Sequence, residues 1–435
     1  WANGGLHLLN ATNGSLTNNL CTTNGYYGIY LDEVGNIILD NNTMSLNDVG
    51  NLYLDQCLSL TLTDNTLSGS GISIVGWPEQ YWSTHSIGTS NKVNGKPVYY
   101  WVAASSGTVP TGAGQVILAG CMHVTVENQD FDQSNGICVG FSAMNTFRHN
   151  TFRGGKGMDL EFSWGNEISN NSFLSSRIYL LGSNNNIIQD NSIEGGTDIG
   201  MYISNSMDNI IVRNVISNIS DALGWSGGIM NDYSQYTVIE DNTIKHCGNN
   251  GISIWSSRGV ILEGNTFIED GIFIVGYVLD DWNTHDIDDT NTVNGKKVCY
   301  MHDQASGSAP SNCGQIIMAN CSNVVVANQN VSNGSAGVLF YACSNITFTS
   351  IVSSGQTYGL FGHVSSNVTI DGGTYDWNYY GILLDGCQNL SVSDSGVSNN
   401  TSCGLLVESC NNVDIQGVYA AHNLNYGGIS VRGPN

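Results

Sequence analysis

The chain has 435 residues, of which 12 are Lys or Arg and 36 are Asp or Glu, so its formal net charge is -24. A field of this sign repels phosphate backbones and anionic lipid, so nucleic acid and the membrane surface are not expected partners. Only 11% of residues are charged while 41% are hydrophobic, so a core can form beneath an uncharged polar surface.

The expected location follows from the start of the chain and from its cysteines. The sequence shows no membrane-spanning run, and it starts at Trp1 rather than Met, which we interpret as a processed, exported protein. Twelve cysteines, an even number, favour an oxidising setting. We therefore expect an extracellular protein at the cell surface.

A short pattern recurs from the first residues onward: apolar-x-apolar, then Asn, Asp or Gly, then another apolar residue. It occurs in "NIILDNNTM" (36–44), "LSLTLTDNTL" (58–67) and "NEISNNSF" (166–173). Alternation of this kind predicts β-strands rather than helices. Asn, Asp and Gly between the strands suit turns, because they tolerate the left-handed backbone conformation.

Residues 77–115 interrupt this pattern as an insertion. Within it, Val93-Asn94-Gly95-Lys96 predicts a tight turn. The insertion and its later copy contain aromatic and lysine side chains that are candidates for a lateral interface or a glycan contact. These are Trp77, Tyr81, Lys96, Tyr99, Trp101, Tyr277, Lys296 and Lys297.

The chain is a tandem duplication with an offset of 200 residues. Residues 71–129 align with 271–329 without a gap, and 28 of the 59 positions are identical. We infer copies at 1–200 and 201–400, a partial third copy at 401–435, and a second insertion at 277–315. No linker is visible, so we expect one continuous stack over residues 1–435.

The second half shows the shortest period most clearly. Its apolar-x-apolar strands start at 323, 345, 367, 389 and 412, a step of 22 or 23 residues. Strands this short cannot bury their apolar residues alone, but stacking each coil on the next does so. The fold class is therefore all-β, a parallel β-helix. A β-sandwich has no reason for a fixed step.

One column of small residues precedes the strand of each coil and contains several cysteines. Equivalent positions on neighbouring coils lie about 4.8 Å apart, within reach of a disulfide. The expected bridges are Cys57–Cys121, Cys321–Cys343 and Cys387–Cys410, and the alternative is a stack of free, buried thiols.

The remaining cysteines fall outside this column. Cys299 and Cys313 replace Tyr99 and Ala113 of the first copy together, so we expect them to bridge each other. Four others have no obvious partner and are buried singly or available for links between molecules: Cys21, Cys138, Cys247 and Cys403.

The sequence offers little catalytic chemistry. Glycan hydrolysis needs two carboxylates, and lyase chemistry needs a basic residue beside carboxylates, yet the arginines are scattered along the chain. The acidic pairs Asp280-Asp281 and Asp288-Asp289 are not conserved between the copies. His85 and His285 lack neighbouring ligands and fit a turn or surface role. We therefore expect no enzyme, no catalytic residue, no cofactor and no metal site.

The coils and the motif "THSIGTSNKVNGKPVYY" (84–100) resemble the NosD-type family of periplasmic copper-maturation and carbohydrate-binding proteins. The resemblance implies a single-stranded right-handed parallel β-helix, common among secreted proteins of methanogenic archaea. Copper handling does not carry over, because no cluster of His, Met and Cys matches. In character the chain also resembles the sheath and surface-layer proteins of methanogens.

These observations lead to three functional hypotheses. The leading one is an exported structural protein that assembles with itself into an archaeal sheath or surface layer, through its terminal coils and insertions. The alternative is a surface protein or adhesin that binds a cell-surface glycan. A polysaccharide lyase or hydrolase ranks third.

Overall fold

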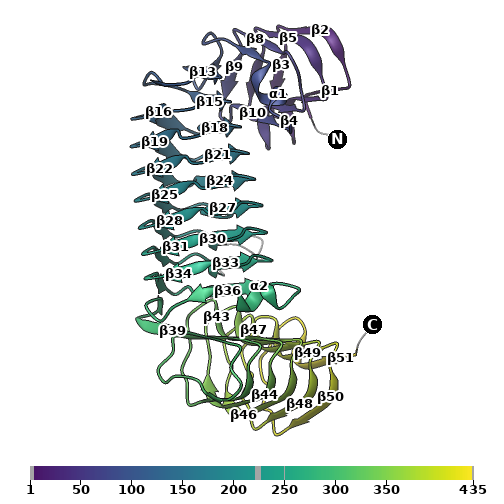
Figure 1. Cartoon of the computed structure of the whole chain (residues 1–435). Helices are drawn as coiled ribbons and strands as arrows, with labels where there is room; N and C mark the ends of the chain where they lie inside the picture. The colour runs from purple at the N-terminus through teal and green to yellow at the C-terminus, as the bar shows by residue number, and fades with distance from the viewer. Residues whose placement is uncertain (1–3, 221–226, 249, 434–435) are drawn as a thin grey trace. The chain divides into compact units, whose positions relative to one another are not determined.

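The computed structural model describes residues 4–220, 227–248 and 250–433. The chain divides into two compact units, residues 1–215 and 216–435, with the boundary inside β29 (Val215–Ser217). Both are built almost wholly from short strands (Figure 1). The helices of the described segments are α1 (Gln80–Ser83) and α2 (Asp280–Asn283), and no helix there is long and apolar enough to cross a membrane.

Unit 1 starts with coils whose three sides form three sheets. The strands of each sheet, in spatial order, are β1 (Leu6–Leu9), β4 (Tyr27–Asp32), β7 (Gly50–Asp55) and β10 (Ile72–Val75) on the first side; β2 (Thr12–Thr17), β5 (Gly35–Asp40), β8 (Thr61–Thr63) and β11 (Ser86–Ile87) on the second; β3 (Leu20–Thr22), β6 (Thr43–Ser45), β9 (Thr66–Ser68) and β12 (Lys92–Val93) on the third.

The insertion of unit 1 redirects these sheets. The strand β12 pairs antiparallel with β13 (Lys96–Val102), and β13 then pairs parallel with β15 (Gln115–Ala119), whereas β10 ends its own sheet. Asn94 and Gly95 at the hairpin have φ of 51° and 76°, which confirms the predicted tight turn.

Regular coils continue after the insertion of unit 1. The first side consists of β15, β18 (Ile137–Gly140), β21 (Gly157–Glu161), β24 (Arg177–Leu181) and β27 (Met201–Ser204). The second side consists of β14 (Gly107–Thr108), β16 (Val124–Glu127), β19 (Thr146–Arg148), β22 (Glu167–Ser169), β25 (Ile187–Gln189) and β28 (Ile210–Val212). The third side consists of β17 (Asp130–Asp132), β20 (Thr151–Arg153), β23 (Ser172–Leu174), β26 (Ser192–Glu194) and β29.

Unit 2 has the same plan. Before its insertion the strands are β30 (Gly227–Asp232), β33 (Asn250–Trp255) and β36 (Ile272–Val275); β31 (Val238–Glu240), β34 (Ile261–Glu263) and β37 (Asp286–Ile287); and β32 (Thr243–Lys245), β35 (Thr266–Ile268) and β38 (Thr292–Val293).

The insertion of unit 2 contains β39 (Lys296–His302), which pairs antiparallel with β38 and parallel with β41. The sides that follow are β41 (Gln315–Ala319), β43 (Ala336–Tyr341), β45 (Tyr358–His363), β47 (Tyr380–Asp385), β49 (Cys403–Glu408) and β51 (Gly427–Arg432); and β40 (Gly307–Ser308), β42 (Ser322–Ala327), β44 (Ser344–Val352), β46 (Ser366–Thr374), β48 (Gln388–Ser393) and β50 (Asn411–Gln416).

The register explains why the coils stack. In unit 2, Val324 lies opposite Ile346 and Ile346 opposite Val368, a step of 22 residues that confirms the predicted coil length. Like residues therefore stack inside each unit: Phe152 stacks on Phe131 and Phe173, with ring centroids 5.1 and 4.4 Å away. The fold is the predicted parallel β-helix, while a single stack over the whole chain stays a prediction.

Buried asparagines form ladders along corners of the coils, a feature that the sequence patterns did not reveal. In unit 1 the Nδ2 groups of Asn150, Asn171 and Asn191 each donate 3.0 Å to the Oδ1 of the next asparagine, ending at Asn214. The residue before each ladder asparagine has a positive φ, 54° at Asn170. Asn was expected at turns for its tolerance of this conformation, but the ladder residue itself points inward and satisfies backbone groups there.

The cysteine column proves to be a ladder of thiols and hydroxyls rather than of disulfides. Cys343 Sγ accepts a hydrogen bond from Cys321 N at 3.4 Å, and Cys410 Sγ accepts one from Cys387 N at 3.2 Å. In unit 1 a serine has the same role, because Cys121 N donates to Ser142 Oγ. These cysteines are free and buried, so the bridges expected at Cys321–Cys343 and Cys387–Cys410 are not formed.

The bridge expected at Cys57–Cys121 was wrong because the insertion of unit 1 separates the two coils. The thiol of Cys57 bonds Leu31 O, and that of Cys121 bonds Trp101 O within the insertion. Of the two alternatives for the four remaining cysteines, the structure agrees with single burial rather than with links between molecules: Cys21, Cys138, Cys247 and Cys403 are free and buried.

Candidate functional site

A pocket of about 260 Å³ lies in unit 1, lined by residues of β4, β7 and β10 on one side and of β18, β21 and β24 on the other. Successive strand residues face opposite sides of a sheet. In β21, Met158 and Leu160 are buried in the core, so Asp159 and Glu161 project from the outer face into this pocket. We call this place the unit 1 corner.

Two cations stand beside these carboxyl groups. Lys156 precedes β21, and its Nζ donates to Ser73 Oγ of β10 at 3.0 Å. Arg177 begins β24 on the next coil, lies 5.3 Å from the ring centroid of Tyr179 and pairs with Asp198 at 3.2 Å. Both cations also line an adjoining hollow of about 560 Å³. Although the arginines are scattered along the sequence, the fold therefore brings Arg177 beside two carboxyl groups.

Burial raises the pKa of both carboxyl groups of the corner. Burial, and then the charge of Asp159, raise the pKa of Glu161 to about 8, so Glu161 is protonated at neutral pH. Burial also raises the pKa of Asp159, while Lys156 and Arg177 oppose that rise. In the described part of the chain no donor bonds Asp159 Oδ1, although this atom is buried. A carboxyl oxygen without a hydrogen-bond donor, beside a neutral carboxylic acid, is suited to acid–base catalysis.

Aromatic side chains flank the carboxyl groups on both sides. His7, Tyr30 and Tyr53 lie opposite one another on β1, β4 and β7 and lead toward Ser73. On the other side, Tyr179 lies opposite Asp159 and is followed by Tyr202. Burial raises the pKa of Tyr179 to about 12, so this phenol stays protonated. Such rings offer flat faces for sugars together with hydroxyl donors.

The equivalent corner of unit 2 is lined by aromatic side chains and a histidine. The strand register places Phe273, Tyr358, Phe361 and His363 where unit 1 has Ser73, Lys156, Asp159 and Glu161. Instead of the Lys156–Ser73 hydrogen bond, Tyr358 stacks on Phe273 with ring centroids 5.2 Å apart. The duplication therefore kept the scaffold of the corner and changed its chemistry.

The insertion residues predicted as contacts do not gather at this corner. Trp77 and Tyr277 are exposed, whereas Tyr81, Tyr99 and Trp101 are partly buried. Lys96 and Lys296 donate to the backbone oxygens of Asp130 and Asn330, and Lys297 pairs with Asp289 at 3.4 Å. Their role as an interface or glycan contact stays a prediction.

The insertion histidines serve the turns. In unit 1, Leu60 N donates to His85 Nδ1 at 3.2 Å, and His85 Nε2 lies 2.8 Å from Tyr81 O, so the neutral ring donates through Nε2. Burial lowers the pKa of His85 to about 4, and His285 has the same surroundings.

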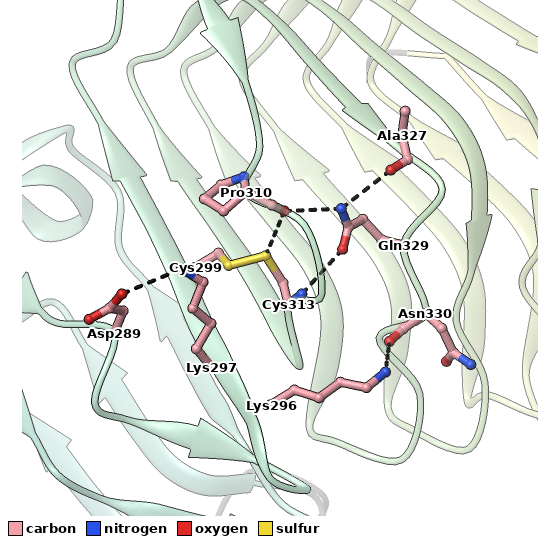
Figure 2. The surroundings of a disulfide bond; sticks show 9 residues. All are labelled: Asp289, Lys296, Lys297, Cys299, Pro310, Cys313, Ala327, Gln329 and Asn330. Carbon is pink, nitrogen blue, oxygen red and sulfur yellow. Dashed lines mark hydrogen bonds and ion pairs between the residues drawn. A yellow bond between two sulfur atoms is a disulfide. The ribbon is translucent and has the colours of Figure 1, made fainter.

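Cys299 and Cys313 form the predicted disulfide, with their Cα atoms 5.8 Å apart (Figure 2). Cys313 N donates to Gln329 Oε1, and Gln329 Nε2 donates to Pro310 O. In unit 1, Gln129 makes the same two contacts, with Ala113 N and Pro110 O, around a loop without a bridge. The disulfide is thus added to a loop that already holds its shape.

Replacing both bridged cysteines by alanine is expected to lower the free energy of unfolding by about 3 kcal/mol, because the closed loop spans 14 residues. Urea denaturation with and without reductant measures this effect. Reductant should shift the midpoint of the wild type and leave the variant unchanged. Cys321→Ser, which keeps a donor to the backbone oxygen of Met301, serves as the control, and equal midpoints for wild type and double variant would contradict the prediction.

Solved structures similar to this chain match it at low identity and low TM-score. The A-module of the mannuronan C-5 epimerase AlgE4 of Azotobacter vinelandii is 14% identical, with a TM-score of 0.26, over 86% of this chain and 90% of that one. The alginate lyase AlyF-OU02 in complex with G6 is 14% identical, with a TM-score of 0.30, over 81% and 80%. PfbA, a surface adhesin of Streptococcus pneumoniae, is 12% identical, with a TM-score of 0.24, over 88% and 83%. No curated protein sequence matches the chain.

The expectation that the chain is not an enzyme is corrected. That expectation relied on the absence of grouped acids and bases, and unit 1 groups Asp159, Glu161, Lys156 and Arg177 around one pocket. Several of the similar structures, among them the epimerase and the lyase, are enzymes, although likeness at this identity shows the fold alone.

The sequence profile described as "Right handed beta helix region" matches residues 1–108, 114–267 and 314–433. The matched segments cover the coils and omit most of the second insertion. This match does not distinguish the NosD-type family, or the sheath proteins of archaea, from other right-handed β-helices. Because the profile matches most of the chain, the chain belongs to the right-handed β-helix family.

Proposed function

We propose that the unit 1 corner is the active site of an enzyme that cleaves an acidic polysaccharide. The observation that carries this proposal is the pairing of Asp159, whose Oδ1 is buried without a hydrogen-bond donor in the described structure, with Glu161, whose pKa is raised to about 8. Asp159 is the general base, and Glu161 is the general acid.

The choice of an acidic substrate follows from the two cations. The chain has only 12 Lys and Arg residues against a net charge of -24, yet two of them share one wall of the pocket. The net negative charge of the chain repels an anionic sugar elsewhere on the surface. Between Lys156 and Arg177, two positive charges would attract the sugar carboxylate instead. Tyr53 and Tyr179 would pack against the sugar rings on either side.

This arrangement favours β-elimination. Asp159 takes the proton from the carbon that bears the sugar carboxylate, and the cations stabilise the negative charge that develops on that carboxylate. The electron pair of the broken C–H bond forms a carbon–carbon double bond as the glycosidic C–O bond breaks. Glu161 donates its proton to the departing oxygen, which leaves one unsaturated sugar end and one hydroxyl end.

The test is incubation of the full chain with polygalacturonate, alginate and glucuronan, with a neutral β-glucan as comparison. Ultraviolet absorbance follows the new double bond, and a reducing-end assay follows every cleavage. Absorbance and reducing ends that rise together on an acidic polymer are the expected result. Reducing ends without absorbance would replace elimination by hydrolysis, and the absence of cleavage on all polymers would overturn the proposal.

Assembly into a sheath or surface layer, binding to itself and an extracellular location stay predictions from the sequence. Two observations that favoured assembly no longer support it. The ladder cysteines are free thiols, and the four cysteines considered for links between molecules are buried. Sedimentation of the full chain at rising concentration tests assembly directly, with a single monomer species at all concentrations as the contrary result.

A further inference from the structure

Unit 2 has a second candidate site at one turn of its coils. Residues 333, 355, 377, 399 and 422 occupy the same place on successive coils, and all have positive φ: Asn333 60°, Gly355 74°, Trp377 61°, Asn399 58° and His422 56°. The backbone confirms this alignment, because Trp377 N donates to Ser398 O as Asn399 N donates to Ala421 O.

Trp377 is unfavourable at this place. The left-handed conformation suits Gly and Asn, and it costs a bulky side chain about 1–2 kcal/mol. Packing does not offset this cost, because the side chain of Trp377 is 67% exposed. Tyr233 and Tyr236 are also exposed at positive φ, so the role of Trp377 has to be argued from its neighbours.

The surroundings of Trp377 indicate the ligand. A hollow of about 320 Å³ is lined by Trp377 and Tyr379, and Tyr379 is 45% exposed. Its other lining residues include Thr357 and Thr401, while the amides of Gln356 and Asn378 are buried and bonded within the coil. Aromatic faces beside hydroxyl groups match the apolar faces and hydroxyl rims of sugar rings.

The charge of the residues around the hollow narrows the class of sugar that can bind there. Glu269 lines the hollow, Asp376 precedes Trp377 in the same turn, and the lining residues in the described structure include no Lys or Arg. This is the reverse of the unit 1 corner, where two cations line the pocket. An acidic sugar would meet only like charge here.

We propose that Trp377 and Tyr379 form a binding site for a neutral glycan in unit 2. The site is separate from the proposed catalytic corner and would hold a sugar chain by stacking, without cleaving it. A protein partner could also use an exposed tryptophan, but the polar lining of the hollow favours a carbohydrate.

The test measures oligosaccharide binding to the full chain in a Glu161→Gln background, so that cleavage in unit 1 does not interfere. The probes are hexasaccharides of β-1,4-glucan, β-1,3-glucan, β-1,4-mannan and α-1,4-glucan, with hexagalacturonate as the acidic comparison, followed by calorimetry. Binding of at least one neutral probe, weakened tenfold or more by Trp377→Asn, is the expected result.

The substitution Trp377→Asn is not expected to disturb folding. Asn is the residue of the neighbouring coil at this turn and suits its backbone, so the variant should be at least as stable as the parent. Tyr419→Asn removes an aromatic side chain that is 69% exposed and lies outside the hollow, and it should leave binding unchanged. Unchanged binding by Trp377→Asn, preference for the acidic probe, or binding of no probe would each overturn the proposal.

Discussion

Replacing Glu161 by glutamine is expected to lower kcat for acidic polysaccharide by about 10²–10⁴-fold, the usual contribution of a positioned general acid. Glutamine has nearly the same shape and fills the buried position of Glu161, but it has no acidic proton to give to the departing oxygen. Initial rates of double-bond formation, measured at saturating substrate, check this loss.

The dependence on pH separates a catalytic role of Glu161 from a structural one. A general acid must be protonated, so activity should fall as the pH rises through about 8, the raised pKa of Glu161. The base Asp159 must be ionised, so the acidic limb should lie above the ordinary range of aspartate, because burial raises its pKa. In Glu161→Gln the residual activity should lose the alkaline limb.

Matched variants complete this test. Asp159→Asn should remove activity to a similar extent, whereas Glu194→Gln, at an exposed carboxyl of the same unit, should change nothing. A Glu161→Gln enzyme that keeps both its rate and its alkaline limb would show that another group donates the proton.

Removing one member of an asparagine ladder should destabilise unit 1 strongly. Asn171 Oδ1 accepts from Asn150 N at 2.9 Å, and Asn171 Nδ2 donates to Phe147 O at 2.9 Å and to Asn191 Oδ1 at 3.0 Å. Asn171→Ala leaves these buried groups without partners, and each such group costs about 1–3 kcal/mol. A loss of about 3–5 kcal/mol in the free energy of unfolding is the expected result.

Urea denaturation measures this loss, and hydrogen exchange of the coils on either side locates it. Asn170→Gly is the control, because it changes the exposed preceding residue to one that suits its positive φ of 54°. The control should change stability by less than about 1 kcal/mol. Equal stability of Asn171→Ala and the wild type would mean that the ladder contributes no net stability.

The fold could be predicted because its signals are local and repeated. The step of 22 residues from Val324 to Ile346 and to Val368 fixes which residues stack, and alternation within each strand fixes which side chains are buried. The pair Cys299 and Cys313 could be predicted for a similar reason, since both changes fall in one short loop of one copy.

The candidate site could not be predicted, because no local pattern links its parts. Ser73, Lys156 and Glu161 come together only because the insertion ends the sheet of β10 and starts another, so their proximity depends on a change of direction. The offset of 200 residues does not find the site either, because coils of unequal length shift the equivalent of Glu161 from position 361 to His363. The two copies have therefore diverged at this corner.

The cysteine ladder was misread for a related physical reason. Spacing between coils allows a disulfide, but it equally allows a sulfur atom to accept a backbone N–H, which is the role of Ser142 and Ser365 elsewhere in the column. Sequence spacing cannot distinguish these outcomes.

The buried thiols also make the molecule its own reporter of local opening. Free cysteines occur from Cys21 to Cys410, and each is shielded by its coil. A thiol reagent can reach such a side chain only while that coil is open, so the rate of alkylation at each cysteine reads the local opening free energy without any added label. Mass spectrometry of the modified peptides would then give a profile of stability along the chain, in which the frayed coils react first.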